Sequence, residues 1–143
     1  MPYCTDYAIK KDVARFFLNQ LNTGLKVYAI DGQKITPTFA DDLAHAFTVI
    51  INKTPQGIYN LSVTDSITPF DFARKIAIEF GFDSDLIEKV SFDEYNRKKT
   101  AKLLKYSWLN SSKFVKEFGS GILHSIDENI KEFKRGVDAL DKN

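Results

Sequence analysis

The sequence predicts an α/β fold in which helices alternate with two or three short strands. Apolar residues recur at the spacing of an amphipathic helix in four to five stretches, and short runs rich in Val, Ile and Tyr lie between some of them. Residues that start and stop helices separate these stretches. The strand–helix–strand order favours parallel pairing with right-handed crossovers. Because two or three strands form a narrow sheet, the sequence predicts an incomplete sheet that needs neighbours.

Composition predicts one soluble domain over residues 1–143. The chain is 43% hydrophobic and 27% charged, which gives enough apolar side chains for a core. The net charge of +1 does not call for nucleic acid as a partner. A single Cys cannot form an internal disulfide, which favours a reducing, cytoplasmic location. The longest apolar run, residues 47–51, is too short to span a membrane, so no membrane partner is expected.

The first third of the chain predicts a helix, a strand and a second helix. The first helix covers about residues 11–21 and ends at Thr23-Gly24. Residues 26–30 are a strand, followed by a turn signal. Thr38 is expected to be the N-cap of the second helix. The apolar stripe expected on that helix consists of Leu43, Ala44, Phe47, Ile50 and Ile51.

The middle of the chain predicts a strand at residues 58–63, a third helix and a short strand at residues 89–92. Thr68 is the expected N-cap of the third helix. Pro69 stands at its first position, where a missing N–H is harmless. Gly81 is expected to end the helix in a left-handed conformation.

The last third predicts a loop followed by two helices. Residues 94–106 are polar and basic and are interpreted mostly as loop. Asn110 is expected to cap a short helix that stops before Gly119. Ser125 and Glu128 form a capping box that opens the final helix. The apolar stripe expected on that helix consists of Ile126, Ile130, Phe133, Val137 and Leu140.

Motifs for redox or metal chemistry are weak. Residues 7–11 and 95–99 both match Y-x-x-x-K, the catalytic pair of short-chain dehydrogenases, but a chain with six Tyr and many Lys gives such matches by chance. A G-x-G-x-x-G loop for a dinucleotide does not occur. Cys4, His45 and His124 lack the spacing of metal ligands. The D-x-D at residues 83–85 is explained more simply as a loop and helix cap.

One segment concentrates positive charge next to aromatic residues. Three interpretations stay open: a solvated loop, a site for a ligand phosphate, or a contact with nucleic acid. Nucleic acid is the least favoured, because the rest of the chain is not basic. The residues concerned are Arg97, Lys98, Lys99, Lys102 and Lys105, with Tyr95 and Tyr106 nearby.

Four motifs occur in an order that resembles the dTDP-4-dehydrorhamnose reductase family. V-Y-A-I-D-G-Q-K-I-T-P-T at residues 27–38, with D-L-A at 42–44, is similar to the family's strand, D-Q-x-x-x-P-T loop and following helix. G-I-Y-N-L at 57–61 resembles its G-x-Y-N/H-x strand. S-I-T-P-F-D-F-A at 66–73 resembles its S-x-x-E-F-A helix start, and S-W-L-N-S-S-K at 107–113 its S-x-L-D-x-x-K.

This resemblance implies a small, incomplete, Rossmann-type C-terminal substrate-binding domain that is not catalytic alone. The family belongs to the extended short-chain dehydrogenase/reductases and reduces a nucleotide-linked 4-keto sugar with NADPH or NADH. NADP or NAD is therefore implied for the complete family protein, and no cofactor for this chain. Residues 2–7 would follow the family's catalytic Tyr and Lys. The implied contacts to the nucleotide-sugar substrate are Gln33, Thr36, Thr38, Lys102 and Ser107.

The chain departs from the family at one segment, and this keeps alternatives open. The family's A-x-R-P is replaced by A-K-L-L at residues 101–104, so Lys102 supplies charge without the bidentate fork of Arg. One alternative is a non-catalytic regulatory or protein-interaction module, because the regulatory subunit of methionine adenosyltransferase resembles the same family. An uncovered strand edge also predicts self-association, a rearranged N-terminal segment, or pairing with the absent Rossmann half.

Overall fold

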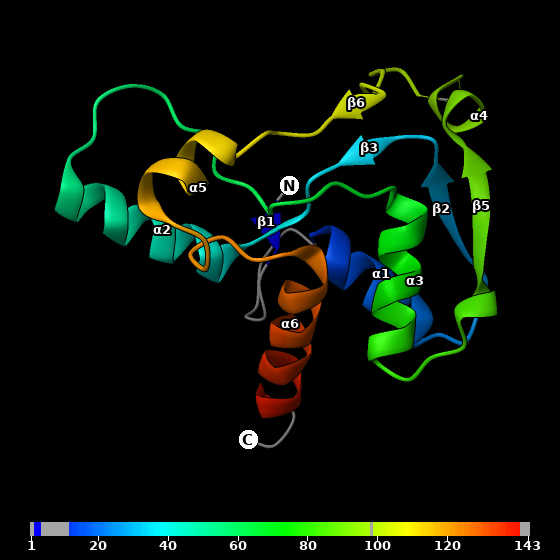
Figure 1. The fold of residues 1–143 in the computed structure, drawn as a ribbon. Helices are drawn as coiled ribbons and strands as arrows, with labels where there is room; N and C mark the ends of the chain where they lie inside the picture. The colour runs from blue at the N-terminus through cyan, green and yellow to red at the C-terminus, as the bar shows by residue number, and fades with distance from the viewer. Residues whose placement is uncertain (1, 4–11, 98, 141–143) are drawn as a thin grey trace.

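The computed structural model describes residues 2–3, 12–97 and 99–140, and these form an α/β fold (Figure 1). The α/β prediction is confirmed. The described residues contain six helices, whereas the sequence predicted four to five. The helices are α1 (Val13–Leu21), α2 (Ala40–Lys53), α3 (Pro69–Glu79), α4 (Phe92–Arg97), α5 (Ser112–Phe118) and α6 (Ile126–Leu140), with a 3-10 turn η1 (Ser84–Leu86). The strands are β1 (Pro2–Tyr3), β2 (Val27–Asp31), β3 (Lys34–Ile35), β4 (Thr38–Phe39), β5 (Ile87–Ser91) and β6 (Tyr106–Ser107).

The described strands form three separate parallel pairs, which agrees with the predicted pairing direction. The longest pair is β2 with β5, in register from Val27 opposite Ile87 to Asp31 opposite Ser91. The other pairs are β1 with β4 and β3 with β6. Helix α3 packs on one face of the β2–β5 pair (Figure 1). Val27 and Ile87 are buried in the same core cluster as α3, whereas Tyr28 is 61% exposed.

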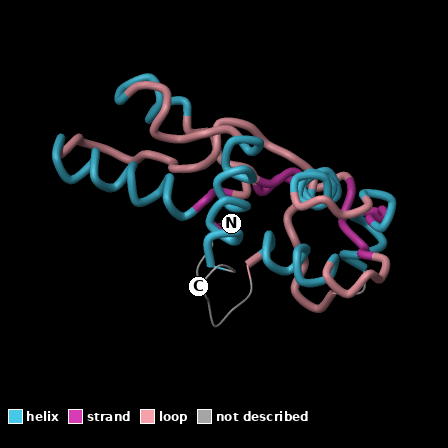
Figure 2. The backbone as a smooth tube through the Cα atoms, turned by 90° about the horizontal axis from the view of Figure 1, so that it is seen from below, coloured by secondary structure: helices cyan, strands magenta, loops and turns pink. Residues whose placement is uncertain are grey.

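The main core lies where α1, α3 and α6 meet the β2–β5 pair. Phe72, Ile76 and Phe133 are fully buried there, and the rings of Phe80 and Phe133 lie 5.5 Å apart. A second, smaller cluster joins α2 to α5 around Phe114. The molecule is therefore elongated, with α2 and α5 at one end and the β2–β5 pair at the other (Figure 2). No helix among the described residues is long and apolar enough to cross a bilayer.

Several predicted helix ends are confirmed because they depend on local hydrogen bonds. The Thr68 side chain accepts from the N–H of Asp71 at 3.0 Å, and Pro69 is the first residue of α3. Gly81 has a φ of +77° after α3 ends, as a left-handed termination requires. The capping box is also present, because Ser125 N donates to Glu128 at 2.8 Å and Glu128 N donates to the Ser125 hydroxyl at 3.3 Å.

The prediction of Thr38 as an N-cap is wrong. Thr38 lies in β4, and the N-cap position of α2 is Phe39, which makes no side-chain capping bond. The predicted apolar stripe of α2 is also largely wrong. Asp42 and Ala46 are its buried residues, whereas Phe47 is 53% exposed. Within the described chain, α2 packs through the Asp42 and Ala46 side against α5 and the start of α6.

Two further predictions about local structure fail. Residues 58–63 form no strand, because their backbone pairs with no described strand, and Ile58 is 86% exposed. The side chains of Asn60 and Ser62 instead donate to the carbonyls of Asn110 and Leu109. The segment interpreted as loop from residue 94 begins inside helix α4. The strand predicted at residues 89–92 is β5, which ends one residue earlier because Phe92 begins α4.

Candidate functional site

Three segments that are distant in the sequence meet around one cavity of about 600 Å³, called the Gln33 cavity below. They are helix α1, the stretch from β2 to β3, and residues 102–107, with α4 alongside. The size is within the usual range for small-molecule sites. Its lining consists of Val13, Phe16, Phe17, Tyr28, Ala29, Ile30, Gln33, Ile35, Pro69, Tyr95, Lys102, Leu103, Leu104 and Ser107.

Gln33 connects the two sides of this cavity by a hydrogen bond. Gln33 is 6% exposed, and its side-chain Nε2 donates to the carbonyl of Leu104 at 2.8 Å. The neighbouring Lys34 N–H donates to the carbonyl of Lys105 at 2.9 Å, where β3 pairs with β6. The backbone of residues 102–107 is therefore held across the cavity by main-chain and amide hydrogen bonds.

Lys102 places its ammonium at the C-terminal end of α4. Its Nζ donates to the carbonyls of Asn96 at 2.9 Å and Arg97 at 3.3 Å, which are positions where a helix favours positive charge. The Asn96 side chain binds the backbone of Leu103 in both directions, accepting from its N–H at 2.8 Å and donating to its carbonyl at 3.2 Å. Asn96 thus positions the Lys102 segment, a role that sequence reasoning missed, since a lone Asn in a polar stretch gives no signal.

The five residues implied by the family resemblance do not all reach the same place. Ser107 lies at the Gln33 cavity with Gln33 and Lys102, and its hydroxyl donates to the carbonyl of Lys34 at 3.4 Å. Thr36 and Thr38 are 3% and 4% exposed and do not line this cavity. The hydroxyls of both residues form hydrogen bonds with backbone groups instead.

The hydroxyl of Thr36 accepts from the N–H of Leu109 at 3.4 Å. The hydroxyl of Thr38 accepts from the N–H of Val63 at 3.4 Å and donates to the carbonyl of Thr36 at 3.3 Å. These bonds fix the loop that presents Gln33.

Aromatic side chains form the open side of the Gln33 cavity, and sequence reasoning did not single out two of them. Phe16 and Tyr28 are 45% and 61% exposed, so both rings offer uncovered apolar surface at the cavity. Tyr28 and Tyr95 also line an adjoining cavity of about 550 Å³ that contains Lys89 and Lys99. The ammonium of Lys99 lies 4.8 Å from the centre of the Tyr95 ring.

The positive charges around these cavities differ in how far they are already neutralised. Lys89 pairs with Asp31 at 2.9 Å, and this hydrogen bond lowers the pKa of the Asp31 carboxyl. Lys102 is bound to carbonyl oxygens only, in the bonds that the structure gives it. Lys102 is therefore better placed than Lys89 to meet an anion. Of the predicted basic segment, Lys98 lies outside the described residues.

The other motifs singled out in the sequence do not contribute to the Gln33 cavity. The Asp83 side chain caps η1 by accepting from Asp85 N at 2.9 Å. His45 and His124 line a separate cavity of about 620 Å³ beside Asp42, and the described residues contain no group of His, Cys, Asp and Glu suited to a metal ion. Tyr7 and Lys11, with Cys4, lie outside the described residues.

A cavity with an aromatic and aliphatic wall, one amide and one ammonium has the properties of a nucleotide site. Flat rings provide stacking surfaces for a base, an amide can pair with base edges, and an ammonium can bind phosphate. The described side chains give no nucleophile activated by a neighbouring base here.

Comparisons with known proteins identify a family and a set of similar folds. The model of the RmlD substrate binding domain family matches residues 7–136. No curated protein sequence gives a significant match.

Several solved structures are similar in fold. The dTDP-4-dehydrorhamnose reductase of Bacillus anthracis, solved with NADP, has a TM-score of 0.82 at 21% identity and aligns with 94% of this chain and 45% of its own. The reductase ortholog of Clostridium acetobutylicum gives 0.79 at 24% identity, over 94% of this chain and 46% of its own. The dTDP-glucose 4,6-dehydratase of Bacillus anthracis, solved with NAD, has a TM-score of 0.69 at 16% identity, and the alignment covers 99% of this chain and 45% of the dehydratase. The chain spans less than half the length of these enzymes.

Proposed function

Because the chain belongs to the RmlD substrate binding domain family, we propose that it binds a nucleotide-linked sugar and that the nucleotide occupies the Gln33 cavity. The observation that carries this proposal is the convergence of Gln33, Lys102 and Ser107. The three residues come from separate segments, and they line one cavity together with exposed aromatic rings. Family membership supports the substrate class, since the proteins of similar fold include a dTDP-4-dehydrorhamnose reductase and a dTDP-glucose 4,6-dehydratase.

Each group in the Gln33 cavity has a distinct part in this proposal. The base lies against the rings of Phe16 and Tyr28, which bury exposed apolar surface when they are covered. Gln33 has a fixed orientation, because its Nε2 is bound to Leu104, so its Oε1 can accept from a base N–H. Lys102 binds a phosphate oxygen through its ammonium. Ser107 adds a hydroxyl to the same wall.

The proposal assigns substrate binding to this chain and hydride transfer elsewhere. The sequence has no glycine-rich loop for a dinucleotide, and the described part of the Gln33 cavity has no activated acid or base. Binding of NADP or NAD would therefore belong to a further Rossmann-type segment. In this proposal a complete reductase activity needs both parts.

Calorimetry with dTDP tests the proposal on the 143-residue chain. We expect saturable binding, and we expect Lys102→Ala to weaken it about tenfold, because a hydrogen bond between charged groups is lost. Lys131→Ala is the matched control, since Lys131 is exposed on α6 away from the cavity. Unchanged affinity in Lys102→Ala would contradict the assignment. Tight binding of NADPH by this chain alone would contradict the division of labour.

A further inference from the structure

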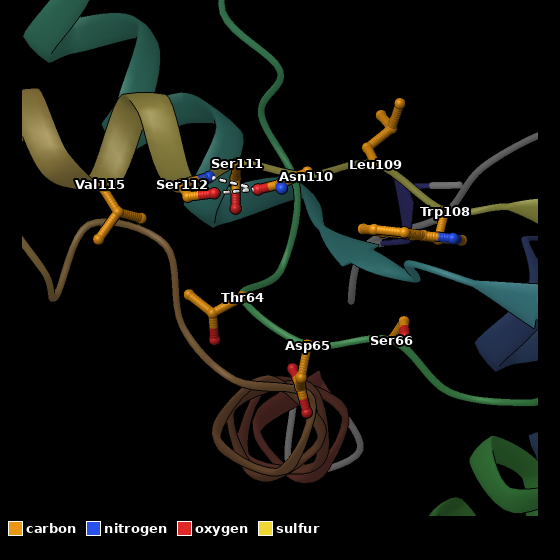
Figure 3. Close-up of a pocket in the computed structure, with 9 residues that line it drawn as sticks. All are labelled: Thr64, Asp65, Ser66, Trp108, Leu109, Asn110, Ser111, Ser112 and Val115. Atoms are coloured by element: carbon orange, nitrogen blue, oxygen red, sulfur yellow. Dashed lines mark hydrogen bonds between the residues drawn. The ribbon is translucent and has the colours of Figure 1, made fainter.

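A second cavity of about 370 Å³ lies between the loop at residues 64–66 and the stretch from Trp108 to the start of α5 (Figure 3). We call it the Trp108 cavity. It shares no lining residue with the Gln33 cavity. Thr64 and Ser66 line one side, and Ser111 lies on the other (Figure 3).

Ser111 is a buried polar residue whose hydroxyl lacks a partner among the described residues. The residue is 5% exposed and stands at the N-cap position of α5, yet its side chain makes no capping bond. The bond is not needed, because Asn110 Oδ1 already accepts from Ser112 N at 2.9 Å. The Ser111 hydroxyl points into the cavity (Figure 3). Because this hydroxyl is open to the cavity and makes no capping bond, a ligand in the cavity can form a hydrogen bond with it.

The remaining lining defines the chemistry of that ligand. Thr64 and Ser66 line the space opposite Ser111, and each of the three residues carries a hydroxyl group. Asp65 is the one charged residue of the lining, and its Oδ1 already accepts from Ile126 N at 3.0 Å. No cationic side chain belongs to the described lining, so phosphates and carboxylates have no counter-charge there.

Trp108 adds a flat apolar surface to these hydroxyls. Its side chain lines the cavity and is 48% exposed, which leaves an indole face available for a ligand. A sugar ring combines hydroxyl groups at its edge with apolar C–H groups on its faces. We propose that the Trp108 cavity binds a neutral pyranose sugar, with Ser66 and Ser111 bonded to its hydroxyls and Trp108 against its face. This site goes beyond the proposed nucleotide site and is independent of it.

The sequence provides a direct reporter for this proposal. Trp108 is the single Trp of the chain, so its fluorescence reports on this cavity alone. The probe is methyl α-D-glucopyranoside, which is neutral and keeps its ring closed. Titration of the whole chain is expected to give a saturable fluorescence change. Ser111→Ala is expected to weaken binding about fivefold, which corresponds to the loss of one neutral hydrogen bond.

Stability separates a ligand contact from a structural role for Ser111. Because the hydroxyl makes no bond within the described chain, Ser111→Ala is expected to leave the thermal midpoint unchanged or higher. Ser66→Ala, on the opposite side of the cavity, is a second variant expected to weaken binding. Ser120→Ala is the matched control, because Ser120 is exposed and does not line the cavity.

Two results would overturn the proposal. One is a fluorescence response that stays absent or linear in sugar concentration. The other is equal affinity in the chain, Ser111→Ala and Ser66→Ala. Lys102→Ala separates this site from the proposed nucleotide site, since it is expected to weaken dTDP binding and to retain the full response to the sugar.

Discussion

Replacing Asp42 by Ala is expected to be among the most destabilising single changes in α2. Asp42 is 3% exposed, and its carboxylate accepts three hydrogen bonds. They come from His124 N at 2.9 Å, His124 Nδ1 at 2.7 Å and Asn129 Nδ2 at 2.9 Å. This one side chain therefore joins the start of α2 to the start of α6, across 82 to 87 residues of sequence.

The magnitude depends on which of these donors can find water after the change. Asn129 is fully buried, and the main-chain donor at His124 is partly buried. Hydrogen bonds to a charged group contribute about 1.5 kcal/mol or more each, so these two donors account for about 3 kcal/mol. The His124 ring is 35% exposed and can turn to water after the change, so its bond is left out of this sum. We expect Asp42→Ala to lower the free energy of unfolding by about 3 kcal/mol.

Urea denaturation followed by circular dichroism measures this loss. Asp41→Ala is the matched control, because Asp41 is also in the first turn of α2 but is exposed. The control also corrects for the favourable effect of a negative charge at a helix N-terminus. A loss for Asp42→Ala below about 1 kcal/mol, or a loss equal to that of the control, would refute this reasoning.

Three further predictions concern pH, a cap and the surface. The hydrogen bond from His124 to Asp42 raises the pKa of His124 above 6.5. The stability that this bond contributes is therefore complete below pH 6.5 and is lost as the pH rises through the folded-state pKa of His124. Urea denaturation at a series of pH values should show this fall in the free energy of unfolding, and His124→Gln should abolish the pH dependence. Ser125→Ala should lower the free energy of unfolding by about 1 kcal/mol in urea denaturation, because the N–H of Glu128 loses its capping oxygen; no loss would exclude a stabilising capping box. Phe47→Lys should change that free energy by less than about 0.5 kcal/mol in urea denaturation, because the ring is 53% exposed; a loss above about 1 kcal/mol would show that the ring contributes to packing.

Features that depend on neighbours along the chain could be predicted from the sequence. The Thr68 cap and the Ser125–Glu128 box both close hydrogen bonds between residues three apart, and both are present. Residues 58–63 show the opposite case. Their composition suits a strand, but a strand needs a partner, and no described segment supplies one.

The candidate site could likewise be predicted only in part from the sequence. Gln33, Lys102 and Ser107 were expected from the order of motifs, and the structure brings them to one cavity. Sequence pattern could not show that Thr38 faces backbone, since a Thr before a helix is usually its cap. It also could not show the role of Asp42, whose partner Asn129 lies 87 residues away.

Binding of a nucleotide in the Gln33 cavity is tested most directly by amide chemical shifts of the ¹⁵N-labelled chain during a dTDP titration. The expected result is a saturable set of shifts at Tyr28, Gln33, Leu104 and Ser107, with the amides of α5 and α6 unchanged. Saturable shifts that avoid these four residues, or no shifts where calorimetry detects binding, would contradict the proposed site.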